Sequence, residues 1–162
     1  MSELLQAIYR GDQAKAEELL AVNPELDIFE AAAAGKTERL RELLDEDPSL
    51  ANGWASDGFQ PLGLASFFGR TAAVRLLLER GAEPNSASQN EMKVMPLHSA
   101  AAATGDPETR FEIAKLLLEH GADPNARQQD DFTPLMAADQ NCDERLRELL
   151  IEHGAETRPT AR

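Results

Sequence analysis

A phrase that occurs three times restricts the folds open to this chain. Residues 76–85 read LLLERGAEPN, residues 116–125 read LLLEHGADPN, and residues 149–156 read LLIEHGAE. In each copy an apolar triplet precedes a glycine, the residue that most easily adopts the left-handed conformation at the end of a helix. Proline follows in two copies, and proline cannot continue a helix. Each copy therefore predicts the end of a helix, after which the chain projects outward.

A second phrase stands before each of these helix ends. It reads FQPLGLAS at 59–66, VMPLHSAA at 94–101 and FTPLMAAD at 132–139. Its proline suits the first turn of a helix, where a missing N–H is harmless. The hydroxyl of Thr133 can cap such a helix, whereas Gln60 and Met95 at the matching positions cap poorly or not at all. Each phrase thus predicts a short helix, which the longer helix of the first phrase follows.

A third duplication extends the pattern toward the N-terminus. The stretch ERLRELL occupies both 38–44 and 144–150, and its leucines are spaced to form one apolar stripe on a helix. We therefore expect ten helices in five antiparallel pairs and no extended sheet. The pairs are predicted at about 3–22, 28–46, 61–80, 96–120 and 134–153. They divide a single domain, 1–162, into units of about 1–26, 27–56, 57–90, 91–129 and 130–157, with a short C-terminal tail at 158–162.

These repeated phrases resemble the ankyrin repeat, which has about 33 residues, a turn, two antiparallel helices and a T-P-L-H-x-A signature. The resemblance rests on TPL at 133–135, PLHSAA at 96–101 and GADPNA at 121–126, whereas the first two units lack the proline phrase. The stretch 47–62 further resembles short, stand-alone bacterial members of the family. The resemblance implies an all-α ankyrin-repeat solenoid with short β-turn fingers that project from the helix pairs.

The end units differ from the middle units in the width of their apolar faces. The end units have narrow stripes edged by charged residues such as Lys15, Arg41 and Arg147, whereas the middle units add Val74 and Ile113. Terminal repeats need a polar outer face, because no further repeat covers them. We therefore expect a complete solenoid with a cap at each end.

The fourth unit departs from the repeat length at two places. Its finger, SASQNEMKVM at 86–95, is longer than the other fingers, and Pro96 lies 25 residues before the closing Gly121, where other units have 20. We interpret the second insertion as a longer link between the paired helices. Surface loops tolerate insertions at little entropic cost. Both insertions therefore fit either neutral drift or a surface adapted to a partner.

Charge limits the classes of partner. The chain has 16 lysines and arginines against 29 aspartates and glutamates, a formal net charge of −13. Such a surface repels phosphate backbones and anionic lipid, so we expect neither nucleic acid nor a bare membrane as a partner. The charge either serves solubility alone or favours a basic partner.

Cys142 is the only cysteine, so no disulfide can form within the chain. A single cysteine suits a reducing compartment. The first twenty residues lack the unbroken apolar stretch of a secretory signal, and no apolar run approaches the ~18 residues of a membrane span. We therefore expect a cytoplasmic protein. Cys142 stands where the third and fourth units have glycine, and we expect it to be a buried or half-buried structural thiol.

The sequence carries no recognisable pattern for catalysis or for a metal. No GxxxxGK[ST] phosphate-binding motif occurs, and each of the three histidines has a structural interpretation. His120 and His153 lie at helix ends, where the dipole favours histidine, and one repeat would hold them about 10 Å apart, too far for one ion. His98 resembles the family histidine whose ring ties the turn region together. We expect no enzyme activity, no cofactor and no metal.

The resemblance places the binding surface on the concave side, which the fingers and the first helices form. Six of the eight aromatic residues fall at such positions, although aromatic side chains usually serve the core. Either Phe67 or Phe68 is expected to pack on the neighbouring unit. Asp57, Glu30 and Glu91 are expected to attract a basic partner. The predicted protein-binding residues are Tyr9, Trp54, Asp57, Phe59, Phe67, Phe68, Met92, Lys93 and Phe132.

Four of these aromatic residues, Trp54, Phe59, Phe67 and Phe68, come from one finger and the helix beside it, so we expect them to lie close together. If they are exposed, serine at Trp54 or Phe68 should change the free energy of unfolding by no more than about 0.5 kcal/mol.

These observations favour a non-catalytic protein-interaction module that binds a partner protein through its concave groove and finger tips. A monomer is expected. One alternative is a regulatory subunit that associates with itself through the same patch, and a concentration-dependent dimer in light scattering would favour it. The alternative from another class is a subunit of an enzyme, which a bound cofactor would favour.

Overall fold

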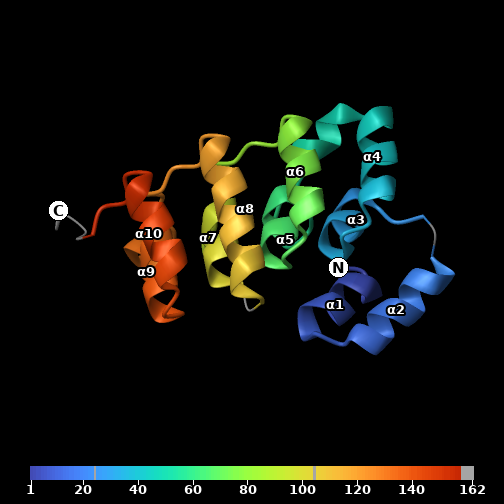
Figure 1. Ribbon diagram of the computed structural model, residues 1–162. Helices are drawn as coiled ribbons and strands as arrows, with labels where there is room; N and C mark the ends of the chain where they lie inside the picture. The colour runs from blue at the N-terminus through green and yellow to red at the C-terminus, as the bar shows by residue number, and fades with distance from the viewer. Residues whose placement is uncertain (24, 104, 158–162) are drawn as a thin grey trace.

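The computed structural model describes residues 1–23, 25–103 and 105–157, so the predicted tail at 158–162 lies outside the described residues. Ten α-helices follow one another in five antiparallel pairs (Figure 1), and the described residues contain no β-strand. The predicted all-α solenoid is confirmed. The helices are α1 (Glu3–Arg10), α2 (Gln13–Val22), α3 (Ile28–Ala34), α4 (Thr37–Glu46), α5 (Pro61–Phe67), α6 (Thr71–Glu79), α7 (Pro96–Ala102), α8 (Pro107–Glu119), α9 (Pro134–Gln140) and α10 (Glu144–Glu152). Two short 3-10 helices, η1 (Pro48–Asn52) and η2 (Gln129–Asp131), were not predicted.

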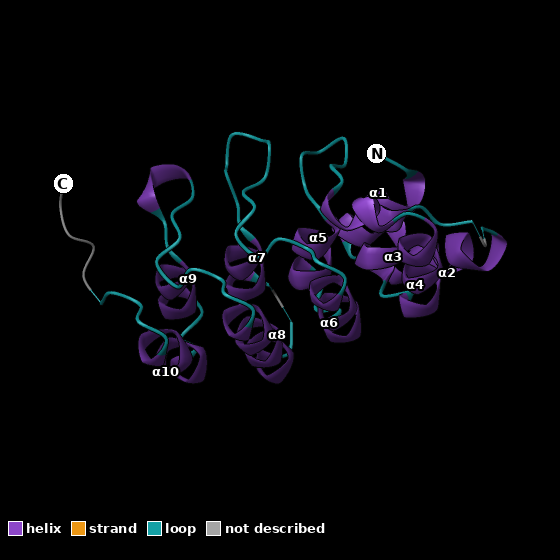
Figure 2. Ribbon diagram, turned by 90° about the horizontal axis from the view of Figure 1, so that it is seen from above, coloured by secondary structure: helices purple, strands orange, loops and turns teal. Residues whose placement is uncertain are grey.

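The first helix of each pair belongs to an inner layer and the second to an outer layer (Figure 2). The inner helices α1, α3, α5, α7 and α9 pack each on the next, and so do the outer helices α4, α6, α8 and α10. Helices this short are marginal alone in water, so packing between neighbours stabilises them. The first pair departs from this stack, because α2 extends away from α4 instead of lying alongside it (Figure 1).

Local signals set the helix ends as the sequence predicted. Each proline of the second phrase occupies the first turn of its helix. The hydroxyl oxygen of Thr133 accepts a hydrogen bond from the Met136 N–H at 3.3 Å, whereas Met95 makes no cap. Gly121 has a φ of 91°, in the left-handed region that a side chain would disfavour. The repeated phrases therefore end helices through the physical signals from which they were predicted.

The asparagine of the first phrase also joins successive units. The Asn85 amide donates to the Gly121 carbonyl at 2.9 Å, and its oxygen accepts the Asp123 N–H at 2.8 Å. Two further residues repeat this pair of bonds: Asn52 bonds Gly81 and Glu83, and Asn125 bonds Gly154 and Glu156. Each asparagine thus satisfies backbone groups just beyond the helix end of the next unit, which fixes the spacing of the stack.

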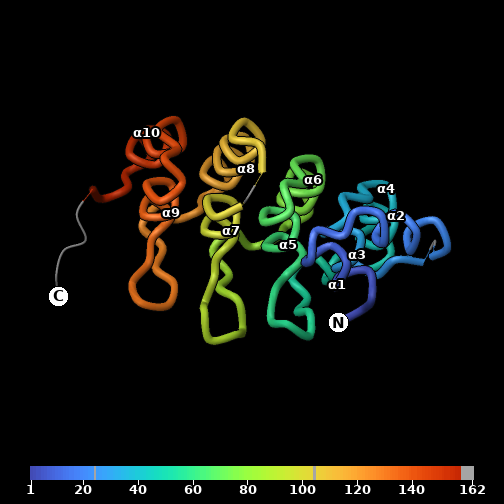
Figure 3. The backbone as a smooth tube through the Cα atoms, turned by 90° about the horizontal axis from the view of Figure 1, so that it is seen from below, coloured from blue at the N-terminus to red at the C-terminus, as the bar shows by residue number. Residues whose placement is uncertain are grey.

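Three fingers project from the inner layer (Figure 3): finger one (54–60), finger two (86–95) and finger three (127–133). A backbone hydrogen bond closes the base of each, from Ala55 to Phe59, from Ser88 to Val94 and from Gln128 to Phe132, at 2.8, 2.8 and 3.0 Å. The extra residues of finger two lie between its closing residues, at the tip. Neighbouring fingers are joined as well, because Gln89 donates to the Gly58 carbonyl and Gln129 to the Met92 carbonyl.

The second insertion of the fourth unit lengthens a helix, so our interpretation of it as a longer link was wrong. Helix α8 has 13 residues whereas α6 has 9. The carboxylate of Asp106 accepts the Thr109 N–H at 3.3 Å, and Pro107 occupies the first turn. An aspartate followed by proline is itself a signal for a helix start, and that signal lies inside the insertion.

The extra turn of α8 carries a buried ion pair. Nη1 of Arg110 lies 2.7 Å from Oδ2 of Asp143, and the two side chains are only 9% and 7% exposed. The guanidinium also donates to the Ala103 carbonyl at 3.1 Å, while the other carboxylate oxygen of Asp143 accepts the Leu146 N–H at 3.1 Å. The pair therefore joins the start of α8 to the start of α10.

Cys142 is exposed, so the expectation of a buried thiol was wrong. Its φ of 52° places it in the left-handed region, at the tight turn between α9 and α10. Gly69 adopts a similar φ of 70° between α5 and α6. The position is thus a surface turn in both units, and the side chain of Cys142 faces solvent there.

Candidate functional site

Tyr9 joins the first unit directly to finger one. Its hydroxyl donates to Oδ2 of Asp57 at 2.9 Å, across 48 positions of sequence. Its ring meets the edge of Phe68 with centroids 5.1 Å apart. Burial, and then the carboxylate of Asp57, raise the pKa of the Tyr9 hydroxyl well above its ordinary value, so the hydroxyl stays protonated. This contact brings α1 to the inner face of the third unit.

The two phenylalanines at the end of α5 have different environments. Phe68 is half-buried and packs against a small cluster of Leu5, Ala33 and Leu64, whereas Phe67 is 39% exposed. Their rings meet edge to face with centroids 5.0 Å apart. Phe68 is therefore the ring that packs on a neighbouring unit, as expected for one of the two. Serine at Phe68 would remove core contacts, so the condition of exposure is not met at this ring and we now expect the change to destabilise the fold.

Two hollows flank Tyr9 and Phe67. The first, which we name the finger pocket, has a volume of about 260 Å³ and lies between α5, α7 and the fingers. The second, which we name the loop pocket, has a volume of about 450 Å³ and lies between the ends of α1 and α5 and the start of α8. The finger pocket is lined by Tyr9, Phe59, Gly63, Leu64, Phe67, Met92, Val94, His98, Ser99, Ala102 and Gln128.

The two pockets differ in chemistry. No aspartate, glutamate, lysine or arginine is among the described residues that line the finger pocket. The loop pocket includes Arg10, Asp106 and Arg110 beside apolar residues. The buried hydroxyl of Ser66 also lines the loop pocket and has no hydrogen-bond partner among the described residues. Desolvation on binding is therefore easiest at the finger pocket, because no charge loses water there.

His98 forms part of the wall of the finger pocket and holds finger three. The residue is buried, and its Nε2 lies 3.0 Å from the Phe132 carbonyl, to which it donates in the neutral tautomer. Burial lowers the pKa of the ring, because the charged form would lose its water. Within the described residues Nδ1 has no partner. The role is structural, in agreement with the expectation that this histidine ties the turn region together.

The structure brings some of the predicted residues together. Phe59 and Met92 line the finger pocket with Tyr9 and Phe67, and Met92 is 48% exposed. Lys93 is exposed next to Met92 on finger two. These side chains come from units one, three and four, so the site depends on the stacking of the solenoid.

Other predicted residues lie apart from this group. Trp54 is 37% exposed, but in the described part of the chain it lines neither pocket. Phe132 is half-buried and packs against the main core. Glu30 is buried, and its carboxylate accepts the Asp27 N–H at 3.0 Å in a capping box at the start of α3. Glu30 is therefore not available for direct contact with a partner, and its attraction of a basic partner stays a prediction.

Gly63 is one of several pocket residues that were not predicted from the sequence; Leu64, Val94, His98, Ser99, Ala102 and Gln128 are the others. Gly63 is the third residue of α5, and the third residues of α7 and α9 are His98 and Met136. A glycine where aligned units have large side chains was the available signal, since glycine inside a helix often marks a site of close approach.

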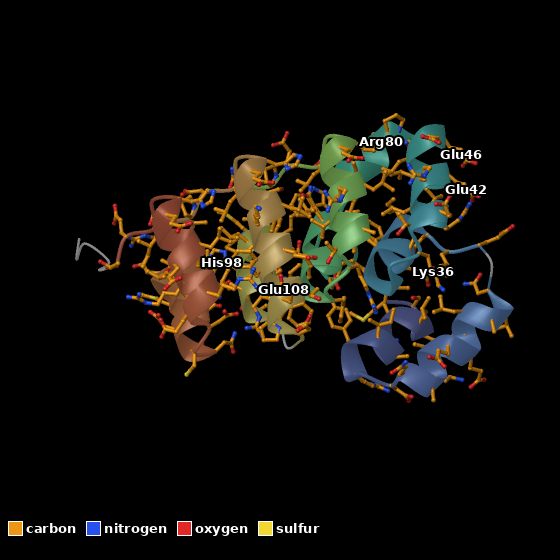
Figure 4. All side chains as sticks on the ribbon, viewed as in Figure 1. Lys36, Glu42, Glu46, Arg80, His98 and Glu108 are labelled. Carbon is orange, nitrogen blue, oxygen red and sulfur yellow. The ribbon has the colours of Figure 1, made fainter. Side chains whose placement is uncertain are left out.

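The other histidines satisfy helix ends. Nδ1 of His120 lies 2.8 Å from the Leu116 carbonyl, and Nδ1 of His153 lies 2.9 Å from the Leu149 carbonyl. Among the described residues, no group of three or more histidine, cysteine or acidic side chains could hold a metal ion. Figure 4 labels charged side chains of the outer layer, among them Glu42 and Glu46 on α4 and Arg80 just after α6. Among the described helices, none is long and apolar enough to cross a membrane.

Comparisons with known proteins agree with the repeated architecture. Residues 4–88 and 86–161 match a family model described as "Ankyrin repeats (3 copies)". The human "DNA-binding protein RFXANK" is 37% identical over 90 residues, which are 56% of this chain and 34% of that protein. The rat "Ankyrin repeat and SAM domain-containing protein 6" is 41% identical over 59 residues, 36% of this chain and 7% of that protein. The chain thus spans about a third of the first relative and less than a tenth of the second, and these mammalian relatives give no support to a bacterial type.

Proposed function

Because the chain belongs to the ankyrin-repeat family, whose repeats are protein–protein interaction modules, we propose that it is a non-catalytic module that binds a partner protein on its concave side. The observation that carries the proposal is the exposed pair of rings, Tyr9 and Phe67, between two pockets. Exposed aromatic side chains in a hollow resemble the anchors that dominate protein interfaces. The binding site comprises this pair with Phe59, Met92 and Lys93, while Asp57 positions Tyr9.

Charge favours a basic protein as the partner. The net charge of −13 raises the local concentration of cations around the site. The same charge opposes DNA, so the DNA binding in the name of the human relative is not proposed for this chain. Association with a basic partner should be faster at low salt, because dissolved ions screen the attraction.

The state that we propose for the free protein is a cytoplasmic monomer. An exposed free thiol such as that of Cys142 persists most readily in a reducing compartment. Self-association through the same rings is the competing arrangement, and light scattering over a range of concentrations separates the two.

Serine in place of Phe67 is expected to abolish partner recovery while the protein stays folded. Phe67 is 39% exposed and its main ring contact is Phe68, so the free energy of unfolding should fall by about 1 kcal/mol or less. If Phe67 is an interface anchor, binding should weaken by about 2 kcal/mol or more. Thermal melts and quantitative pull-downs of the same preparations measure both effects.

Val22→Ser is the matched control, since it also removes an exposed apolar side chain. Val22 is 74% exposed and lies on α2, away from the two pockets. Trp54→Ser tests whether finger one contributes beyond the two pockets. Recovery of every partner in full by folded Phe67→Ser would show that this ring is not part of the binding site.

A further inference from the structure

Gly63 lines the finger pocket and contributes no side chain to it. The same position, the third residue of the helix, carries His98 in α7 and Met136 in α9. A β-carbon built on Gly63 would lie 3.5 Å from Cδ1 of Phe59, an ordinary van der Waals contact, and the backbone there is not left-handed. Neither crowding nor backbone conformation therefore requires glycine.

Glycine at this position is nevertheless unfavourable for folding. Gly63 lies in the first turn of α5, and glycine within a helix lowers stability relative to alanine, because it gives the unfolded chain more conformational freedom. Glycine weakens the helix and leaves room at the surface. We expect such a residue where a side chain of a partner needs that room. Gly63 is buried and lines the pocket, so a side chain at this position would take up part of the pocket's space.

Size and chemistry restrict what fits this hollow. Its volume of about 260 Å³ is below the roughly 300–1,000 Å³ of sites for whole small-molecule ligands, but suffices for one large side chain. Its walls include three aromatic rings, those of Tyr9, Phe59 and Phe67, together with the thioether of Met92. Rings favour edge-to-face contact with another ring, and a thioether contacts a ring favourably.

The charges on the fingers indicate which kind of residue would flank that side chain in the partner. The three fingers contain four acids, Asp57, Glu91, Asp130 and Asp131, against two bases, Lys93 and Arg127, so their net charge is 2 − 4 = −2. The carboxylate of Asp57 accepts the hydrogen bond of the Tyr9 hydroxyl at 2.9 Å, at the edge of the pocket that Tyr9 lines. Cationic residues beside the incoming side chain would thus meet fingers with a net negative charge, whereas the uncharged walls suit an uncharged group.

We propose that the finger pocket receives one aromatic side chain, flanked by lysine or arginine, from a segment of the partner protein. This assignment rests on the proposed function and gives the partner its chemistry. Tyr9 forms one wall, so the pocket is complete only when the first unit is docked on finger one.

Selection from a library of random short peptides displayed on phage tests the assignment without knowledge of the partner. The full chain is the bait, and binding of the selected peptides is then measured with synthetic copies by fluorescence anisotropy. We expect the selected peptides to share one aromatic residue with basic neighbours. Serine at that aromatic residue should weaken binding by about 30-fold or more, the factor that corresponds to loss of an interface anchor.

Gly63→Leu should weaken binding of the same peptides by a similar factor, because the new side chain fills the pocket. Its melting temperature should be equal to or above that of the wild type, since a helix-favouring residue replaces glycine. Gly63→Ala, which adds one carbon, should cause a smaller loss and keeps the test valid if Gly63→Leu folds poorly. Ala72→Leu adds the same side chain at an exposed position of α6 and should bind as wild type.

Three results would overturn the assignment. One is selection that yields no basic aromatic peptide, and another is undiminished binding of such peptides by folded Gly63→Leu. The third is a dimer that Gly63→Leu converts to monomer, which would make a second copy of this chain the occupant. The proposed function is tested by a different variant: it fails if Phe67→Ser recovers partners in full. Failure of the pocket assignment can therefore be told apart from failure of the proposed binding site.

Discussion

Replacement of Arg110 with alanine is expected to lower the free energy of unfolding by about 3–5 kcal/mol, because it leaves the charge of Asp143 buried without its partner. The two side chains are only 9% and 7% exposed, and Nη1 lies 2.7 Å from Oδ2. The guanidinium also donates to the Ala103 carbonyl at 3.1 Å, so one substitution removes several charge-assisted bonds. Urea unfolding followed by circular dichroism measures the loss.

A double variant shows whether the unpaired charge causes that loss. In Arg110→Met with Asp143→Asn no charge remains, while asparagine still caps the Leu146 N–H. The double variant should therefore be more stable than Arg110→Ala, as replacement of buried ion pairs by apolar groups is often tolerated. If Arg110→Ala costs less than about 1 kcal/mol, the range of a surface ion pair, water screens this pair and our interpretation fails.

Leu117→Ala is expected to cost about 2–5 kcal/mol, since it opens a cavity in the middle of the stack. Leu117 of α8 is completely buried, and Leu77 occupies the equivalent place in α6, so Leu77→Ala should have a similar effect. Helices α6 and α8 each pack against an outer helix on both sides. The loss of packing therefore weakens the contacts with the neighbouring units as well. Denaturant melts of both variants provide the measurement.

Leu20→Ala is the control from the first unit. Leu20 is half-buried on α2, which does not pack alongside α4. A frayed end unit need not unfold the rest of a solenoid, so the global loss should be smaller than for Leu117→Ala. If Leu20→Ala proved the most damaging of the three substitutions, the first unit would have to be central to the fold instead of capping it.

The helix pairs were predictable because the signals that define them are local. Each copy of the repeated phrases contains its own start and stop residues, such as Pro134 after Thr133 and the left-handed Gly121. The start of α8 was not predicted, although an aspartate followed by proline, here Asp106 and Pro107, is a signal for a helix start. Insertions between helices usually form loops, and the prediction followed that rule. The asparagine bonds between units were also readable in principle, as Asn85 and Asn125 occupy equivalent places.

The candidate site was only partly predictable, because its decisive contacts join distant parts of the chain. The bond from Tyr9 to Asp57 spans 48 positions, and no local pattern shows that α1 turns toward the third unit. The same limit explains why Phe68 could not be distinguished from Phe67 in advance. A side chain becomes core or surface according to what packs over it, and here Leu5 of the first unit packs against Phe68.

The claim that the concave rings contact a partner is tested most directly by photo-crosslinking from that position. Phe67→p-benzoylphenylalanine places a photoreactive ring at the site, and Met92 is a second position on finger two. Arg75 and Lys115, exposed on α6 and α8 of the outer layer, are matched control positions. We predict that irradiation joins the same partner to positions 67 and 92, and that Phe59→Ser weakens this product. Products from positions 75 and 115 alone would place the interface on the outer layer and contradict the account.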